Sequence, residues 1–386
     1  MPTPQEVIAP ITIINYGRVA VDAAKEYNPA LGILESKGNI VQKEGGESLY
    51  WPVEAGEYEA VSVGDYEDVS AGYVPHKLHV GANLPWGELL AQDALSKGQM
   101  RRNRGTEALV EFKNRRIPKM FRSLLTEGAG SLGYRFLRDA GTIGAQPMFG
   151  LPSIFKFASA ANTSKEAAVT AAATYAGLSL EMNGLAALAD NADPYAWTPR
   201  GINTDFDWDG DGSADGELTI ANFSHVFSYA QSNVTFGMDP ALKPDCAILD
   251  RNYFEIGRAF IGDKQQIHIN KADMGNNKWG LGNSVEMFYH NGLAYYWDAS
   301  QAANTGSVLN FDQIELDRLK PVGPISGDNY DGSKGGDKKK DEDNRWFELE
   351  ISFNDTRRGI NVSATFPGQF KFMSPRFQAE VKKRTA

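Results

Sequence analysis

Apolar and polar residues alternate most regularly in the C-terminal part of the chain. Every second residue is apolar over 347–353 and again over 360–366, with polar residues between them. Because the side chains of a β-strand point alternately to opposite faces, this period of two predicts two strands joined by a turn. A shorter alternation at 59–63, in a segment rich in Gly, Tyr and Val, predicts a long β-hairpin over 41–85.

Apolar residues also recur at spacings of three and four, which predicts a helical region over 86–127 with one apolar face. These apolar residues are Leu109, Phe112, Ile117, Met120, Phe121, Leu124 and Leu125. Thr106 is a candidate N-cap and Gly128 a candidate stop signal. Pro118 should kink this helix or break it in two.

Helices and strands are expected to mix between 165 and 305. The Ala-rich segment 164–189 is predicted to be helical, and a second amphipathic helix is predicted around 220–230. Residues 246–260 (CAILDRNYFEIGRAF) predict a buried strand that runs into a helix. Residues 285–298 predict two strands around a tight turn at Asn291–Gly292. Residues 1–40 favour an extended arm with a short helical piece at 19–27.

Composition places the chain among folded globular proteins, since 42% of its 386 residues are hydrophobic and 23% are charged. The net charge of −10 argues against tight, non-specific binding to DNA, which needs Lys and Arg to neutralise phosphates. The single cysteine, Cys246, excludes an intrachain disulfide and is expected to be a buried small hydrophobe. We expect no signal peptide, because the N-terminus has no basic leader, and no membrane span.

Charge is distributed unevenly along the chain. The segment 44–68 contains eight acidic residues and no Lys or Arg: Glu44, Glu47, Glu54, Glu57, Glu59, Asp65, Glu67 and Asp68. The polar face of the helix predicted next is basic: Arg101, Arg102, Arg104, Lys113, Arg115, Arg116, Lys119 and Arg122. The two segments are either ordinary solvated faces or complementary patches that meet between subunits and determine their register.

The stretch DFDWDGDGSADGE, residues 205–217, has the spacing of a cation-binding loop. Calcium takes six to eight oxygen ligands, which alternate carboxylates on a tightly turned loop can supply. The candidate ligands are Asp207, Asp209, Asp211, Ser213, Asp215 and Glu217. The twelfth position of the loop is Leu218, and Glu217 comes one place early, so we expect a weak site with a dissociation constant of roughly 10⁻⁴ to 10⁻³ M. The alternative is a solvated acidic loop without a metal.

Other chemical signals are weak. His76 and His79 are three positions apart and would point to opposite faces of a strand, which favours two surface histidines over a metal pair. The sequence contains no G-x-x-x-x-G-K, H-E-x-x-H or G-x-S-x-G motif. No carboxylate pair stands out as a general acid and base. We therefore expect no catalytic residues and no enzymatic activity.

The order of these features resembles that of tailed-phage major capsid proteins, with the fold first described for phage Hong Kong 97. The resemblance rests on the acidic hairpin introduced by EGGESLYWPVEAG, the helix after it and the run QPMFGLPSIF. LKPDCAILDRNYFEIGRAF, NGLAYYWDASQAANTGSVLNFDQIELDRL and RWFELEISFNDTRRGINVSATFPGQFKFMSPRFQAEV resemble later parts of the same family. No motif is specific alone, but their order and spacing together carry the resemblance, which covers nearly the whole chain.

The resemblance implies an α+β fold with five parts. These are an N-terminal arm (1–40), an extended β-hairpin loop (41–85), a peripheral domain with a long spine helix (86–164), a mixed α/β axial domain (165–309) and a return to the peripheral domain (310–386). The aspartate loop, near 203–218, and a polar loop at 325–345 are expected as insertions. The aspartate loop would then act as a local staple near the capsomer axis, with structural, weakly bound Ca²⁺.

The resemblance also implies a function. Copies would form hexamers and pentamers that close into an icosahedral shell around double-stranded DNA, located in the virion and assembled in the host cytoplasm. Expected partners are the chain itself, the packaged DNA without tight binding, and portal, scaffolding or decoration proteins. We further expect the acidic hairpin to dock near the basic helix of a neighbouring copy. The alternatives are an encapsulin-like nanocompartment shell protein and, from another class, a calcium-dependent surface binding module.

Overall fold

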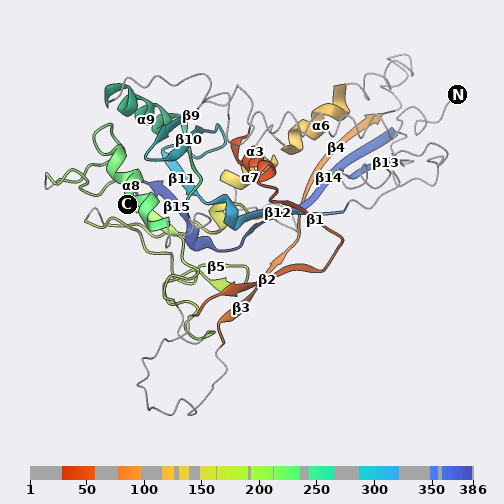
Figure 1. The fold of residues 1–386 in the computed structure, drawn as a ribbon. Helices are drawn as coiled ribbons and strands as arrows, with labels where there is room; N and C mark the ends of the chain where they lie inside the picture. The colour runs from red at the N-terminus through yellow and green to blue at the C-terminus, as the bar shows by residue number, and fades with distance from the viewer. Residues whose placement is uncertain are drawn as a thin grey trace, which may run out of the picture.

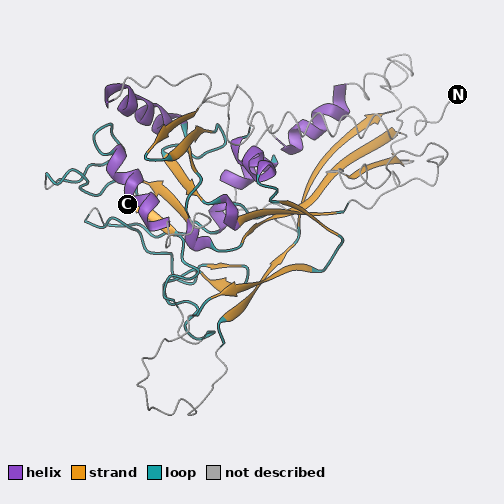
Figure 2. Ribbon diagram, in the orientation of Figure 1, coloured by secondary structure: helices purple, strands orange, loops and turns teal. Residues whose placement is uncertain are grey.

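A computed structural model of the chain describes residues 28–56, 77–96, 115–125, 130–138, 148–161, 163–189, 193–211, 213–234, 243–264, 287–320, 348–354 and 359–384. Within these residues two main β-sheets combine with helices, as Figures 1 and 2 show. The predicted α+β class is confirmed. None of the described helices is both long enough and apolar enough to cross a membrane.

The first sheet is built around one long strand. Its strands are β1 (Ile40–Lys43), β4 (Gly87–Ser96), β12 (Ile314–Leu319), β13 (Glu348–Asn354) and β14 (Gly359–Phe372). The first half of β14 pairs with β4 and β13, one on each side, and its last residues pair with β12. The strands predicted from alternation at 347–353 and 360–366 are confirmed, with Ile351 opposite Val362 in the register.

The second sheet is buried on both faces. Its order is β7 (Arg200–Asn203), β15 (Gln378–Lys382), β11 (Thr305–Leu309), β8 (Cys246–Leu249), β10 (Leu293–Trp297) and β9 (Met287–His290). Cys246 and Ile248 on one face of β8 belong to the core shared with the first sheet. Ala247 and Leu249 on the other face pack in a core with helices α8 (Phe223–Val234) and α9 (Arg251–Lys264). This alternation between two cores explains why the strand is apolar at every position.

Three local predictions in this part of the chain are confirmed. Residues 246–260 form β8 followed by α9, and Cys246 is buried. Asn291 and Gly292 connect β9 to β10 and both have positive φ, 50° and 77°, as a type I′ hairpin turn requires. The helix predicted around 220–230 is α8, although Ile220 precedes it. Reciprocal hydrogen bonds between Thr219 and Asn222 mark its start.

The predicted helical region 86–127 is wrong in its first part. Residues 87–96 form β4, which pairs with β14 along ten residues. The helix in this region, α6 (Ile117–Leu125), is nine residues long, and the predicted cap Thr106 and stop Gly128 lie outside the described residues. Pro118 is in the first turn of α6, where a missing N–H is tolerated, so the expected kink is absent from the described helix.

The helix predicted over 164–189 is also wrong. This segment forms turns and two short strands, β5 (Thr174–Tyr175) and β6 (Leu178–Ser179). Ala172, Ala176 and Asn183 have φ values of 60°, 51° and 62°, in the left-handed region that a right-handed helix excludes. Burial of residues such as Tyr175, which is 3% exposed, outweighs the helix propensity of the alanines.

The base of the predicted hairpin is confirmed. Strands β2 (Ser48–Glu54) and β3 (His79–Pro85) pair antiparallel, with Leu49, Trp51 and Val53 on the buried face. The ribbon extends from the lower part of the molecule in Figure 1. Residues 57–76, which include the alternating stretch 59–63 and His76, lie outside the described residues.

An element that we did not predict precedes the first sheet. Helix α3 (Pro29–Ser36) lies within the segment expected to be an extended arm, and the side chain of Asn28 caps its first turn. The remaining short elements are α7 (Leu132–Leu137), η2 (Leu151–Ser153), η4 (Phe311–Gln313) and η5 (Pro375–Phe377). The five predicted domain boundaries stay predictions. We note, however, that β15, within the predicted return to the peripheral domain, pairs with β7 and β11 of the second sheet.

Candidate functional site

The structure brings three of the predicted metal ligands together. Carboxylate oxygens of Asp207, Asp209 and Asp215 all lie within 4.8 Å of one another. Asp211, Ser213 and Glu217 are not part of this group. The Asp211 carboxylate instead accepts a hydrogen bond from the Ser213 amide at 2.7 Å.

Backbone hydrogen bonds hold the aspartate loop in shape. Asp207 Oδ1 accepts hydrogen bonds from the amides of Gly210 and Asp211, at 2.6 and 3.1 Å. Asp215 Oδ2 accepts from the Trp208 amide at 3.0 Å and from Asn222 Nδ2 at 3.1 Å. Gly210 and Gly216 have φ near 79° and 74°, which a residue with a side chain rarely adopts. The carboxylates are therefore positioned by the loop itself.

The surroundings of the Asp209 carboxylate shift its pKa. The hydrogen bond from the Asp211 amide lowers its pKa, but desolvation and the nearby carboxylates of Asp211, Asp215 and Asp207 together outweigh that effect. The net result is a raised pKa. A cation among these oxygens would relieve the repulsion that raises it.

Aromatic residues attach the aspartate loop to the second sheet and α8. Trp208 Nε1 donates to the Asn203 carbonyl at 3.0 Å, and its ring contacts Phe206 and Tyr229 edge-on, with centroids 5.3 Å apart in both cases. The ammonium group of Lys165 lies 5.2 to 5.6 Å from the centroids of all three rings. These distances are in the range of cation–π attraction, so Lys165 helps to hold the base of the loop.

The described part of the predicted basic helix exposes its cations. On α6 and the turn before it, Arg115, Lys119 and Arg122 are exposed, whereas the apolar face is buried. Arg116 is half-buried and forms an ion pair with Asp93 of β4 at 3.3 Å. A hollow between β4 and α6 is lined by Arg116 and Lys119. Arg101 and Arg102 lie outside the described residues.

The acidic segment 44–68 is described from residue 44 to residue 56, where Glu44 and Glu47 are exposed. Glu54 is exposed on β2, and Glu57, Glu59, Asp65, Glu67 and Asp68 lie outside the described residues. Figure 1 places the β2–β3 ribbon at the bottom of the molecule and α6 at the top. Within one chain, therefore, β2 and α6 do not meet.

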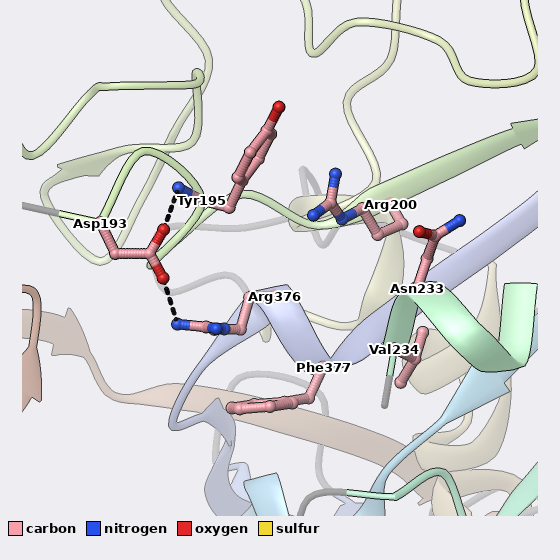
Figure 3. Close-up of a pocket in the computed structure, with 7 residues that line it drawn as sticks. All are labelled: Asp193, Tyr195, Arg200, Asn233, Val234, Arg376 and Phe377. Atoms are coloured by element: carbon pink, nitrogen blue, oxygen red, sulfur yellow. Dashed lines mark hydrogen bonds and ion pairs between the residues drawn. The ribbon is translucent and has the colours of Figure 1, made fainter. Parts of the chain in front are cut away.

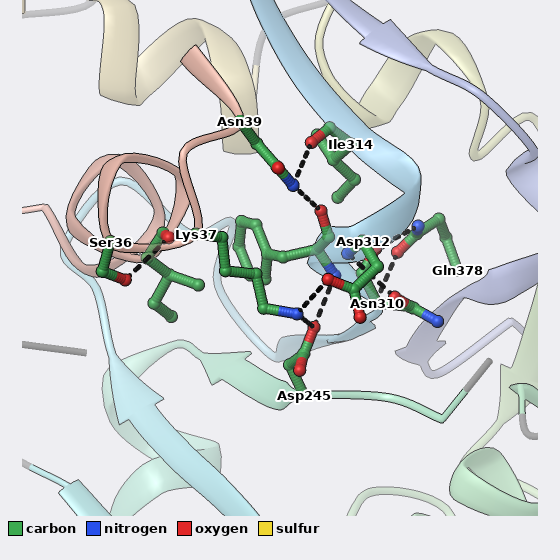
Figure 4. A network of polar contacts seen from close by, with 10 residues as sticks. Ser36, Lys37, Asn39, Asp245, Asn310, Asp312, Ile314 and Gln378 are labelled. Atoms are coloured by element: carbon green, nitrogen blue, oxygen red, sulfur yellow. Dashed lines mark hydrogen bonds and ion pairs between the residues drawn. The ribbon is translucent and has the colours of Figure 1, made fainter. Parts of the chain in front are cut away.

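Sequence reasoning missed a polar network between the two sheets. Lys37 Nζ, just after α3, contacts Asp245 Oδ2 at 2.7 Å and Asp312 Oδ1 at 2.6 Å (Figure 4). Asp245 precedes β8 of the second sheet, and Asp312 precedes β12 of the first. The partners are 208 and 275 residues from Lys37 in the chain, so no local pattern could reveal them.

A second missed feature is a small cavity between η5, the start of β7 and the end of α8 (Figure 3). Two arginines, Arg200 and Arg376, form part of its wall. Arg376 pairs with Asp193 at 2.8 Å, across 183 residues of sequence. The described residues around it carry no arrangement of nucleophile and base.

Comparison with known proteins identifies the fold. A scan against protein-family models and a search of curated proteins found no match. Among solved structures, a chain of the cyanophage A-1(L) capsid is similar, with a TM-score of 0.50, 14% sequence identity and 93% of each chain covered. A capsid chain of a native GTA particle gives a TM-score of 0.45 at 10% identity, covering 92% of this chain and 90% of that one.

An encapsulin complex from Synechococcus elongatus has a lower TM-score of 0.41, with 6% identity over 89% of this chain and 84% of that one. The likeness to the cyanophage A-1(L) chain extends over nearly the whole length of both proteins. The two sheets, the hairpin base and the helices described above therefore together form the α+β fold of a phage capsid subunit.

Proposed function

We propose that the chain is the major capsid protein of a tailed phage, which assembles as hexamers and pentamers into an icosahedral shell around double-stranded DNA. The observation that carries this proposal is the capsid-subunit fold over 93% of the chain. The role is structural, with no catalytic step. The protein would be located in the virion, after assembly in the host cytoplasm.

The chemistry of the chain suits a shell wall. Many modest contacts, repeated in a closed symmetric array, make a stable assembly without any single strong bond. The net charge of −10 limits the capture of phosphates, so packaged DNA could move past the wall. Portal, scaffolding or decoration proteins would be further partners.

Contacts between copies would include the acidic hairpin of one subunit and the basic surface of α6 in another. Supporting this, α6 exposes Lys119 and Arg122 and contains no acidic residue, while the hairpin segment 44–68 contains no basic one. The described base of the hairpin, β2 and β3, lies away from α6 within one chain (Figure 1). Opposite charges on two such surfaces favour one register of association over others.

The aspartate loop would act as a staple that holds Ca²⁺ or a similar ion. Asp207, Asp209 and Asp215 would be its ligands, since hard oxygen donors suit that ion. Three gathered carboxylates, fewer than the six ligands predicted, suit weak binding completed by water or carbonyl oxygens.

Sedimentation and negative-stain electron microscopy of the protein expressed alone would test the proposed function. Closed shells, or hexamers and pentamers, are expected. Shells that contain proteins in place of DNA, when isolated from the native source, would support the nanocompartment alternative. A monomer that neither assembles with a scaffolding partner nor forms capsomers, and that binds calcium tightly, would contradict the proposal and favour a binding module.

A further inference from the structure

The cavity between η5, β7 and α8 is lined mainly by charged and polar residues. Its lining includes the guanidinium groups of Arg200 and Arg376, the carboxylate of Asp193 and the amide of Asn233. Phe377 and Val234 provide the apolar part of the wall, and both are largely buried. Figure 3 shows these side chains arranged around one space, although they come from three separate segments.

Both arginines are held in place by an aromatic ring and a carboxylate. The Arg200 guanidinium lies 4.2 Å from the centroid of the Tyr195 ring and pairs with Glu166 at 3.3 Å. The Arg376 guanidinium lies 5.2 Å from the Phe377 ring and pairs with Asp193 at 2.8 Å. Their side chains are only 19% and 18% exposed. Stacking and pairing therefore limit the motion of two planar, forked donors, which lowers the cost of binding an acceptor.

Donors exceed acceptors on this wall. A guanidinium has five N–H groups, but within the described part of the chain Arg200 donates only one hydrogen bond, to Glu166. Both oxygens of Asp193 are already engaged, by the Tyr195 amide and by Arg376. Because the wall offers unused hydrogen-bond donors, a ligand that fits it should supply hydrogen-bond acceptors.

Charge and size narrow the class of ligand. Two guanidinium groups and one carboxylate line the cavity, so the lining itself carries +2 − 1 = +1, while Glu166, which pairs with Arg200, lies outside the lining. The volume is about 110 Å³, which leaves room for a small group such as a carboxylate with its first carbon atoms. Carboxylates are also the planar partners that arginine forks recognise best.

We propose that this cavity is a binding site for a single carboxylate, held mainly by Arg200 and Arg376. The carboxylate could be an acidic side chain of a second copy of the chain or a small free acid. Binding by the cavity does not depend on the proposed function; only the first of these two sources does.

Binding of acetate to the full-length, unassembled protein would test the site. Saturation-transfer NMR would measure it at constant ionic strength, with acetate replacing chloride. We expect saturable binding that is about tenfold or more weaker in Arg200→Gln, as the loss of a charge-assisted hydrogen bond predicts. Arg200→Lys retains the charge but loses the planar fork, and it should weaken binding as well. Circular dichroism would confirm that both variants fold.

Arg251→Gln is the matched control. Arg251 also lies over an aromatic ring, Trp297 at 5.0 Å, and pairs with a carboxylate, Glu255, but it does not line the cavity. Acetate binding should be unchanged in this variant. No saturable binding to the wild type, or equal binding by wild type and a folded Arg200→Gln, would overturn the proposal.

Assembled particles distinguish the two sources. If a second copy supplies the carboxylate, assembly fills the cavity and particles lose acetate binding, and folded Arg200→Gln subunits assemble less well. If the natural ligand is a free acid, particles and unassembled subunits bind acetate equally. Both outcomes agree with a carboxylate site, and they show whether a second copy of the chain or a free acid occupies it.

Discussion

Asp298 is a buried carboxyl group that follows β10. It is 5% exposed, one oxygen accepts a hydrogen bond from the Ser300 amide at 2.7 Å, and the other has no partner among the described residues. Burial raises its pKa to about 6, although its hydrogen bonds with Ser300 act in the opposite direction. The folded state therefore binds the Asp298 proton more tightly than the unfolded state, in which the pKa is near 3.8.

This difference makes the contribution of Asp298 to stability depend on pH. Below about pH 4 the Asp298 carboxyl group is neutral in both states and does not reduce the free energy of unfolding. As pH rises from about 4 to 6 the unfolded state loses the proton first, so the free energy of unfolding falls, and above pH 6 the loss is complete. At about 1.4 kcal/mol per pKa unit, the full effect is on the order of 3 kcal/mol.

Asp298→Asn should remove this pH dependence. The variant retains an oxygen for the Ser300 amide but carries no charge, so its stability relative to wild type should rise between pH 4 and pH 7. Urea denaturation of the unassembled protein at several pH values would measure the change. A difference between the two proteins that stays constant across this range would contradict the assignment.

At the scale of elements, Lys37 connects the segment after α3 to both sheets. Its side chain is 11% exposed, as is that of Asp245, whereas Asp312 is 38% exposed. Asp245 Oδ2 also accepts a hydrogen bond from the Phe311 amide at 2.8 Å. The network therefore links the start of β8 to the start of β12 (Figure 4).

Lys37→Met should destabilise the protein by about 3 kcal/mol, because it leaves the carboxylate of Asp245 largely buried without its cation. Chemical denaturation would measure the loss. Adding Asp245→Asn to the variant should recover part of it, since the unpaired charge is removed. The control Arg258→Met removes a cation that is 62% exposed, paired with Glu255 at 3.8 Å, and should cost less than about 1 kcal/mol.

The aspartate loop gives a second prediction at this scale. If the loop holds calcium, adding a chelator should lower the melting temperature, because an ion that binds only the folded state stabilises it. Asp209→Asn should abolish the response to calcium. Asp211→Asn, outside the group of three carboxylates, should retain it. Identical melting with and without calcium in the wild-type protein would favour the alternative of a loop without a metal.

At the scale of the whole molecule, the proposed contact between hairpin and α6 predicts that charge reversal impairs assembly. Lys119→Glu with Arg122→Glu should reduce particle formation while the subunit stays folded, because both side chains are exposed. Glu57→Lys with Glu59→Lys should have the same effect. Combining all four substitutions should restore assembly in part.

Sedimentation would measure particle yield for these variants, and circular dichroism would report folding. Arg258→Glu, an exposed reversal on α9, is the control and should assemble normally. Normal shells from both double variants would exclude this contact but would leave the shell function itself intact.

Errors in the predicted elements arise where contacts with distant parts of the chain outweigh the local pattern. The helix predicted over 86–127 rests on apolar spacings at 109–125 and includes β4, whose own residues do not alternate clearly in polarity. The strand geometry of β4 depends on β14, where Leu90 pairs with Thr365 and Ala94 with Asn361. In 164–189, residues such as Ala172 have a left-handed φ that an α-helix excludes. Burial of Tyr175 there outweighs the helix propensity of the alanines.

Local sequence was enough to predict the features that depend on neighbours a few residues away. These are the alternating strands β13 and β14, the Asn291–Gly292 turn, the step from β8 to α9 and the gathering of Asp207, Asp209 and Asp215. Each follows from local periodicity, turn residues or ligand spacing.

Which distant segments meet could be learned from the folded molecule alone. The ion pairs of Lys37 with Asp245 and of Arg376 with Asp193 join residues 208 and 183 positions apart. The same holds for the strand pairing of β4 and for the cavity that Arg200 and Arg376 line. Such contacts arise from burial of the whole core, which no window of neighbouring residues contains.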